Sequence, residues 1–482
     1  MQFDFDVAIV GGGSGGFAAA RTTANAGLKT VVIEGGEEVG GLCILRGCMP
    51  TKALLYAAEV KHLAEHAEMW GLRSEKVTFD FAKAMARKDT VIKDFADYRV
   101  QQLNEGKFKF IRANAKFVDA HTLELNPLRG SEREFAHSEN ANESRLTSAA
   151  TITAKNFVIA TGSRVAPTPL PQLRDVGYLT SDDVLKLNKL PKTMLILGGG
   201  AIGCEFAQYL SRFGVKITLI QRSPHVLHDF DADVAAEIEK VFRREGVEIF
   251  TNTKLFDARR DGDLKTVVFD CHGKMTSASA EEILFALGRV PNTAGIGLEK
   301  AGVKTEHGRI VCDEFMRTSA PHIFAAGDCV GLHDIVHLAV LQGEAAGKNI
   351  IKLDSCKMDY RLFIEIVFTD PQIAQVGITE KQASAKNVPY LAASYPFGDH
   401  GKSIIMEARD GFVKLLCGPK SGEILGGTCI GPAGGELIHE IVVAMSKRMT
   451  VQELATIPHY HPTLAEIWTY PAEELAEKIK AA

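Results

Sequence analysis

The sequence lacks the features that would place it in a membrane, outside the cell or on nucleic acid. No apolar run among its 482 residues approaches the roughly 18 residues that a membrane-spanning helix needs. It has no block of Lys and Arg, and its net charge of −5 gives no basic surface for nucleic acid or an anionic membrane. Acidic residues stand near its start, where a signal peptide would carry positive charge. We therefore expect a cytoplasmic enzyme with no nucleic-acid partner and no membrane partner.

Cysteine is also scarce, with nine residues spread over the whole chain. An odd number at this low density is not typical of the disulfide framework of a small secreted protein. Two of the nine, Cys43 and Cys48, lie five positions apart. Zinc sites usually take Cys at a spacing of two to four, so we predict a redox pair here and no metal site.

The predicted chemistry centres on this pair, in residues 40–56, GGLCILRGCMPTKALLY. In a regular helix, residues five apart are about 8–9 Å apart at Cα, beyond the roughly 7 Å limit of a disulfide. A bridge between Cys43 and Cys48 therefore needs a local distortion, for which Gly47 and Pro50 are the expected positions. Such a strained bridge is easily reduced, which favours exchange chemistry over a structural role.

A dinucleotide-binding unit is predicted at the amino end. An apolar strand at 5–10 leads into a glycine-rich turn, an Ala-rich helix to about Ala26, and a second strand at 30–33. The glycines allow a pyrophosphate to approach the helix N-terminus, and the acid that ends the second strand can accept hydrogen bonds from ribose. The candidate cofactor contacts are Gly11, Gly13, Ser14, Gly16 and Glu34.

The same arrangement recurs at 194–222, with the candidate contacts Gly198, Gly200, Gly203, Gln221 and Arg222. Gln221 stands where the first unit has an acid. Loss of that carboxylate removes repulsion of a 2′-phosphate, and Arg222 can pair with one, so NADP(H) is favoured over NAD(H). The alternative is that Arg222 is an ordinary charged residue at a solvated strand end. Two such units predict two dinucleotides, most simply a flavin and a nicotinamide.

Further candidate cofactor contacts follow other apolar strands, namely Thr161, Gly162, Gly288 and Asp328. A carboxylate at a tight strand end suits a polyol chain, although a turn-forming Asp gives the same pattern. Residues 126–148 are rich in Ser, Glu and Asn, and we predict an exposed connection there. Beyond about residue 350 the pattern is strand-rich and then helical, with no third fingerprint, which predicts a separate domain.

This last domain contains a candidate acid–base pair in the segment HYHPTLAE. Pro462 fixes the backbone behind His461, and Glu466 can return to hydrogen-bond the imidazole from the next turn. A His oriented by a carboxylate is a general acid–base unit. A His near a Glu is more often structural, but thiol chemistry at Cys43 and Cys48 needs such a base.

Together these motifs resemble the class I flavoprotein disulfide reductases, the family of dihydrolipoamide dehydrogenase, glutathione reductase and mercuric reductase. The likeness covers nearly the full length: GGxCxxxGCxPTK at 40–52, both glycine fingerprints, AAGD at 325–328 and HPTxxE at 461–466. The resemblance implies FAD, a homodimer with a shared active site, and a small-molecule or protein-bound disulfide or dithiol substrate. Hydride from NAD(P)H would pass through FAD to the Cys43–Cys48 disulfide and on to the substrate, or in reverse.

Carried over by position, the resemblance also implies individual roles. Cys48 would be the flavin-proximal thiol, and Cys43 the thiol that exchanges with substrate. Lys52 and Glu205 would form an ion pair beside the flavin. Glu34 would bind the adenosine ribose and Asp328 the ribityl chain, and His461 with Glu466 would complete the site of the other subunit.

The expected fold class is α/β, with two Rossmann-like dinucleotide-binding domains for FAD and NAD(P) and a C-terminal α+β dimerisation domain. The predicted boundaries are 1–160 and 286–350 for the two parts of the FAD-binding domain, 161–285 for the NAD(P)-binding domain, and 351–482 for the dimerisation domain.

The substrate is less defined than the reaction type. The HYHPTLAE segment looks most like dihydrolipoamide dehydrogenase, whereas Ser14 and Arg21 look more like glutathione reductase. In the redox loop, Leu42, Leu45 and Arg46 stand where these enzymes usually carry Thr, Asn and Val. The favoured reaction is dihydrolipoamide dehydrogenase-like. The alternatives are an NADPH-dependent reductase like glutathione or mercuric reductase, and a flavin-based quinone or oxygen reductase or redox sensor.

Overall fold

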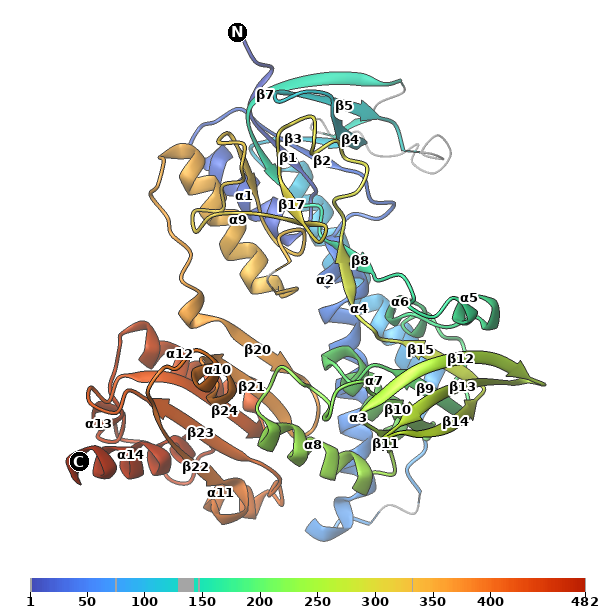
Figure 1. Ribbon diagram of the computed structural model, residues 1–482, viewed down its shortest axis with the longest axis vertical. Helices are drawn as coiled ribbons and strands as arrows, with labels where there is room; N and C mark the ends of the chain where they lie inside the picture. The colour runs from blue at the N-terminus through green and yellow to red at the C-terminus, as the bar shows by residue number, and fades with distance from the viewer. Residues whose placement is uncertain (1, 74–75, 129–142, 146–147, 332, 482) are drawn as a thin grey trace. The chain divides into compact units, whose positions relative to one another are not determined.

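The structure is a computed structural model that describes residues 2–73, 76–128, 143–145, 148–331 and 333–481 (Figure 1). The chain divides into two compact units. The first comprises Met1–Thr51, Met85–Pro167 and Gly288–Met358. The second comprises Lys52–Ala84, Thr168–Leu287 and Asp359–Ala482.

The first unit is built on a sheet whose central strands are parallel. β1 (Phe5–Val10) pairs with β2 (Thr30–Glu34) on one side and with β7 (Ala150–Ile159) on the other, and β19 (Ile323–Ala325) also pairs with β7. β1, β2 and β19 are almost continuously buried, as expected of parallel strands that are covered on both faces. The carboxyl ends of these strands therefore lie along one edge of the sheet.

Two helices of this unit pack unusually closely, as Figure 1 shows for α1 (Ser14–Asn25) and α9 (Val336–Ile351). A methyl group added at Gly343 of α9 would lie 2.1 Å from the carbonyl oxygen of Gly15 in α1. One added at Gly347 would lie 2.9 Å from Cβ of Thr22. The glycines thus let the two helix backbones touch, which fixes α1 over the sheet.

The second unit contains a parallel sheet in the order β11–β10–β9–β15. Its strands are Glu248–Phe250, Lys216–Ile220, Thr193–Leu197 and Glu282–Phe285. α7 (Ala201–Arg212) follows β9, and α8 (Ala232–Arg244) precedes β11. An antiparallel ribbon of β12 (Thr253–Asp261), β13 (Leu264–Cys271) and β14 (Lys274–Ala280) interrupts the unit before β15.

The carboxyl-terminal part of the same unit is an antiparallel sheet in the order β20–β21–β24–β23–β22. Its strands are Ile364–Val367, Gln372–Gly377, Ile424–Gly431, Phe412–Cys417 and Leu391–Pro396. α12 (Gly434–Ser446) and α14 (Thr469–Ala481) close its core, in which Phe397 and Trp468 are fully buried. Burial of such large side chains is the main source of stability in this part.

The predicted α/β class, with two Rossmann-like units and a C-terminal α+β part, is confirmed. The four domain boundaries given above stay predictions. Residues 129–142 and 146–147, which make up most of the predicted exposed connection, lie outside the described residues.

Candidate functional site

The first glycine-rich turn joins β1 to α1 and has room only for glycine at two positions. Gly11 has φ +107°, and a methyl group there would lie 2.3 Å from the carbonyl oxygen of Ala160. A methyl group at Gly16 would lie 1.9 Å from the carbonyl oxygen of Gly11. These contacts hold the helix start against the sheet, and Gly13 forms the N-cap of α1 directly before Ser14.

Glu34, at the end of β2, holds this turn together. One carboxylate oxygen accepts a hydrogen bond from the backbone N–H of Gly12 at 2.7 Å, and the other accepts from Gly36 at 2.6 Å. The acid that the spacing placed at the ribose is therefore also a structural part of the loop.

The second turn, between β9 and α7, repeats this geometry. Gly198 has φ +104°, and a methyl group at Gly203 would lie 1.9 Å from the Gly198 carbonyl oxygen. Gln221 takes the place of Glu34, since its Oε1 accepts from the backbone N–H of Gly199 at 3.1 Å. Gln221 is buried, whereas Arg222 is exposed.

Both helix starts fit the phosphates of a dinucleotide. Within the part of the chain that the structure describes, no side chain caps α1 or α7, and neither has an acid in its first turn. A methyl group at Gly200 would meet nothing described within 4 Å. The first backbone N–H groups of each helix are thus open to an anion, which the helix dipole also favours.

Several strand ends of the first unit meet at Asp328. Its Oδ2 accepts from Ser163 Oγ at 2.6 Å, and Ser163 Oγ in turn accepts from Arg289 Nε at 2.8 Å. These partners come from β8 (Ser163–Val165) and β16 (Arg289–Pro291). The predicted contacts Thr161 and Gly162 precede Ser163, and Gly288 precedes Arg289. The sequence did not identify Ser163 or Arg289, because single residues at the start of short strands carry no motif of their own.

The two cysteines of the predicted redox pair lie on consecutive helices. Cys43 is in α2 (Gly41–Arg46) and Cys48 begins α3 (Cys48–Glu65), and both are half-buried. The helical run is interrupted at Gly47, one of the two positions where the sequence predicted a distortion. A methyl group at Gly47 would lie 3.0 Å from the carbonyl oxygen of Leu42 and 3.2 Å from Cα of Cys43.

The start of α2 rests on the first glycine turn. Gly40 and Gly41 have φ +147° and +76°, which favour glycine over other residues. A methyl group at Gly41 would lie 2.8 Å from Cα of Gly13. The double glycine therefore brings the cysteine-bearing helix directly against the first dinucleotide loop.

Arg99 of α4 (Phe81–Asn104) is a cation beside this loop that the sequence did not identify. Its guanidinium lies over the Phe17 ring, 4.3 Å from the ring centroid. Its Nε and Nη1 are buried and have no hydrogen-bond partner among the described residues. Burial lowers the pKa of Arg99, and the charge of Cys43 acts in the opposite direction. Arg99 is therefore within electrostatic range of the exchange cysteine.

Lys52 and Glu205 are in contact in the second unit. Lys52 Nζ donates to Oε1 and Oε2 of Glu205 at 2.9 and 2.8 Å, and lies 4.5 Å from the centroid of the Phe368 ring. The backbone N–H of Phe368 also donates to Glu205 Oε1, at 3.0 Å. The Glu205 side chain is 5% exposed and that of Lys52 is 31% exposed. The buried Glu205 carboxylate thus holds the partly exposed Lys52 ammonium in place.

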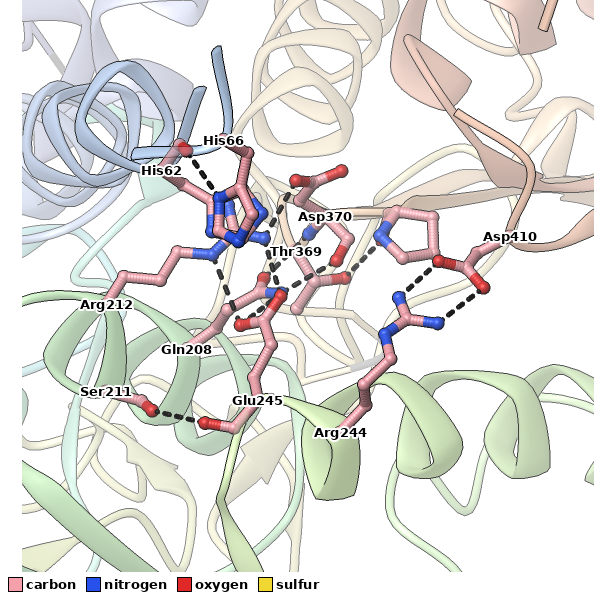
Figure 2. Close-up of polar contacts among 11 residues, drawn as sticks. His62, His66, Gln208, Ser211, Arg212, Arg244, Glu245, Thr369, Asp370 and Asp410 are labelled. Atoms are coloured by element: carbon pink, nitrogen blue, oxygen red, sulfur yellow. Dashed lines mark hydrogen bonds and ion pairs between the residues drawn. The ribbon is translucent and has the colours of Figure 1, made fainter. Parts of the chain in front are cut away.

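The far end of α7, the helix that carries Glu205, is fixed by a charge network around the buried Arg212 (Figure 2). Arg212 Nη2 donates to Glu245 at 2.7 Å and to Asp370 at 2.8 Å. Gln208 Nε2 donates to the carbonyl oxygen of Asp370 at 2.7 Å. The helix is therefore tied at one end by its glycine turn and at the other by Arg212.

His461 and Glu466 are also in contact. His461 Nδ1 lies 3.1 and 3.0 Å from the two oxygens of Glu466, which precedes α14. The His461 side chain is 77% exposed and that of Glu466 is 9% exposed. A second imidazole, that of His400, reaches the same carboxylate from the buried side, with Nε2 3.3 Å from Oε1. No sequence motif pointed to His400.

The described ranges contain neither a metal centre nor a membrane-spanning helix. No group of three or more His, Cys, Asp or Glu residues there is arranged to hold a metal ion. No helix there is long and apolar enough to cross a membrane.

Comparison with known proteins decides the family. Residues 5–343 match the pyridine nucleotide-disulphide oxidoreductase model, and residues 364–472 match the dimerisation domain of the same family. The chain belongs to this family. It is 36% identical over 475 residues to a dihydrolipoyl dehydrogenase of Geobacillus stearothermophilus, covering 98% of this chain and 96% of that protein.

Solved structures agree with this assignment. LpdA from Mycobacterium tuberculosis superposes with a TM-score of 0.85 at 27% identity, covering 97% of this chain and 99% of that one. The HOCl-induced flavoprotein disulfide reductase RclA from Escherichia coli gives a TM-score of 0.82 at 25% identity, covering 97% and 99%.

The predicted family and reaction type are therefore confirmed. This pyridine nucleotide-disulphide oxidoreductase is an FAD-dependent enzyme that uses NAD(P) and a disulfide or dithiol substrate. Its dimerisation domain makes it a homodimer.

Proposed function

We propose that this oxidoreductase works through the Cys43–Cys48 pair and that its substrate is a dihydrolipoamide-type dithiol or the corresponding disulfide. The observation that carries the proposal is the break at Gly47, which sets the two cysteines on separate helices beside the first glycine turn. Similarity to dihydrolipoyl dehydrogenases over nearly the whole chain supports the substrate class.

The two glycine turns hold the dinucleotides, FAD at α1 and the nicotinamide at α7, through the open N–H groups of each helix. When bound between these groups, FAD would supply the two-electron transfer chemistry that links the nicotinamide to the cysteine pair. Glu34 keeps its turn in shape while it reaches the ribose, and Ser163 fixes Asp328 for the ribityl chain. Glu205 holds the Lys52 ammonium as a fixed positive charge beside the flavin.

The cysteines then carry out disulfide exchange. The Cys43 thiolate attacks one sulfur of the substrate disulfide, forms a mixed disulfide, and releases the other sulfur as a thiolate that takes a proton. The Cys48 thiolate next attacks Cys43, which restores the internal bridge and releases the second substrate sulfur. Dithiol oxidation is the same sequence in reverse. The Arg99 cation favours the thiolate form of Cys43.

His461 manages the protons of this exchange. Its Nδ1–H is held by Glu466, so Nε2 is the atom left to accept or donate a proton. The high exposure of His461 supports a role at the cysteine pair of the second copy in the homodimer.

NADP(H) is the proposed nicotinamide. Gln221 replaces the acid in the loop-fixing position and carries no negative charge to repel a 2′-phosphate. The exposed Arg222 is free to pair with it. The wild type should therefore give a higher kcat/KM with NADPH than with NADH. Arg222→Met should lower the NADPH value about tenfold, the loss of one charge-assisted hydrogen bond. Preference of the wild type for NADH would refute this assignment.

Anaerobic titration of the purified enzyme with NADPH or NADH tests the whole proposal. We expect a long-wavelength thiolate-to-flavin charge-transfer band near two-electron reduction, which Cys48→Ser should abolish. Cys43→Ser should abolish lipoamide reduction, while Cys271→Ser, at a half-buried cysteine elsewhere, should not. Bleaching with no such band, and quinone reduction that survives Cys43→Ser, would instead indicate a plain flavin reductase. Faster turnover with oxidised glutathione than with lipoamide would indicate a glutathione reductase-like enzyme.

A cytoplasmic location stays a prediction.

A further inference from the structure

Glu466 lies between two imidazoles of opposite exposure. His461 approaches both carboxylate oxygens at 3.1 and 3.0 Å from a side chain that is 77% exposed. His400 approaches Oε1 at 3.3 Å from a side chain with no exposure at all. This approach is an electrostatic contact by distance, because the buried His400 Nε2 makes no hydrogen bond to the described residues.

The other ring nitrogen of His400 contacts a hydroxyl, which can either donate or accept. Nδ1 lies 2.8 Å from Oγ of Ser403, which is itself fully buried. A neutral imidazole that faces a carboxylate with Nε2 must carry its proton there, so Nδ1 accepts from the Ser403 hydroxyl. The chain of contacts therefore runs from Ser403 through His400 to Glu466 and ends at His461.

The surroundings of His400 favour its neutral form. The ring of Phe397 stands edge-on at 6.3 Å and that of Tyr470 at 6.4 Å, and Tyr395 stacks on Tyr470 at 4.0 Å. The charged and titratable groups that face His400 are Glu466 and His461, with the Tyr470 phenol behind the ring. Burial lowers the pKa of His400, while Glu466 acts in the opposite direction.

We propose that His400 is a positioning residue for disulfide exchange, whose buried Nε2–H attracts the Glu466 carboxylate at 3.3 Å and so holds it where it orients His461. The inference rests on the proposed function, in which His461 moves the protons of the exchange. His400 is buried and contacts neither the substrate nor the cofactors in that scheme, so it acts only through Glu466.

His400 can position Glu466 because a buried carboxylate needs nearby N–H groups to compensate its charge. An unsatisfied buried charge is costly, and Glu466 receives one imidazole from the solvent side and one from the core. With the core donor removed, the carboxylate is free to turn toward water and His461 loses its fixed direction. Steps that need His461 should slow, whereas hydride transfer to the flavin should not.

Two half-reactions of the full-length holoenzyme separate these steps. NADPH-driven reduction of lipoamide needs the cysteines and His461, and NADPH-driven reduction of ferricyanide needs only the flavin. His400→Gln places an amide N–H near the position of Nε2, and His400→Asn places it near Nδ1. We expect His400→Asn to lower lipoamide turnover about tenfold, as for a lost hydrogen bond to a charged group. His400→Gln should restore most of that loss, and ferricyanide reduction should stay unchanged in both variants.

His461→Gln is the reference variant. If it leaves lipoamide turnover intact, the proposed function itself fails. If it lowers turnover while both His400 variants behave like the wild type, only the role of His400 is wrong. Equal loss of lipoamide and ferricyanide turnover in His400→Asn would also overturn the inference, because it would indicate a general structural role.

Discussion

The contact between Lys52 and Glu205 gives the sharpest test of the proposal that Glu205 holds Lys52 as a fixed positive charge for flavin chemistry. Glu205 Oε1 accepts from both Lys52 Nζ and the Phe368 N–H, whereas Oε2 accepts from Lys52 alone. Glu205→Gln keeps the size of the side chain and one acceptor. In either amide orientation, however, an NH₂ group must face the Lys52 ammonium, so at least one bond is replaced by a contact between two donors.

The expected cost follows from the burial of the two groups. A hydrogen bond to a charged group contributes about 1.5–3 kcal/mol. Because the Lys52 side chain is 31% exposed, water can replace part of what is lost, and we take the lower end of that range. About 1.5 kcal/mol corresponds to roughly a tenfold lower rate if the ammonium must return to its place in the transition state.

Ferricyanide reduction by NADPH, measured as a double-mutant cycle, tests this value. Glu205→Gln and Lys52→Met should each lower kcat about tenfold, and the double variant should be no slower than Lys52→Met. Glu248→Gln, at an exposed carboxylate of β11 in the same unit, is the control and should leave kcat unchanged. If the two losses multiply, or if Glu205→Gln has no effect, Glu205 does not act by holding Lys52.

Three further outcomes are expected. Arg212→Met should lower the free energy of unfolding by about 3 kcal/mol because Glu245 and Asp370 lose the buried cation that joins them. Arg244→Met, in a more exposed pair, should cost under about 1 kcal/mol, and thermal midpoints compare the two variants. Gly16→Ala should give a colourless protein, since its methyl group would meet a carbonyl oxygen at 1.9 Å, whereas Gly203→Ala should stay yellow and lose NADPH binding in titration. Because burial lowers the pKa of His400, the unfolded chain binds more protons below about pH 6.5, and the protein should lose stability as the pH falls through this range. His400→Gln should flatten that loss of the thermal midpoint, and an unchanged pH dependence would contradict the assignment.

Features set by short stretches of chain could be predicted from the sequence. The two glycine turns were predicted because a β–turn–α crossing leaves no space for a side chain at Gly11 and Gly16. The break at Gly47 was predicted because residues five apart are too distant in an unbroken helix. His461 and Glu466 were predicted to meet because they lie within about one turn of each other.

Contacts between distant parts of the chain were decided by tertiary packing. Lys52 and Glu205 are separated by 153 positions, and only a family resemblance connected them before the fold did. Arg99 lies over Phe17 and within electrostatic range of Cys43 because α4 meets α1 inside the first unit. His400 lies beside Glu466 because the residues after β22 meet those before α14. Sequence spacing fixes only the local backbone path. Which group lies next to a buried charge depends on how the helices and strands pack in the tertiary structure.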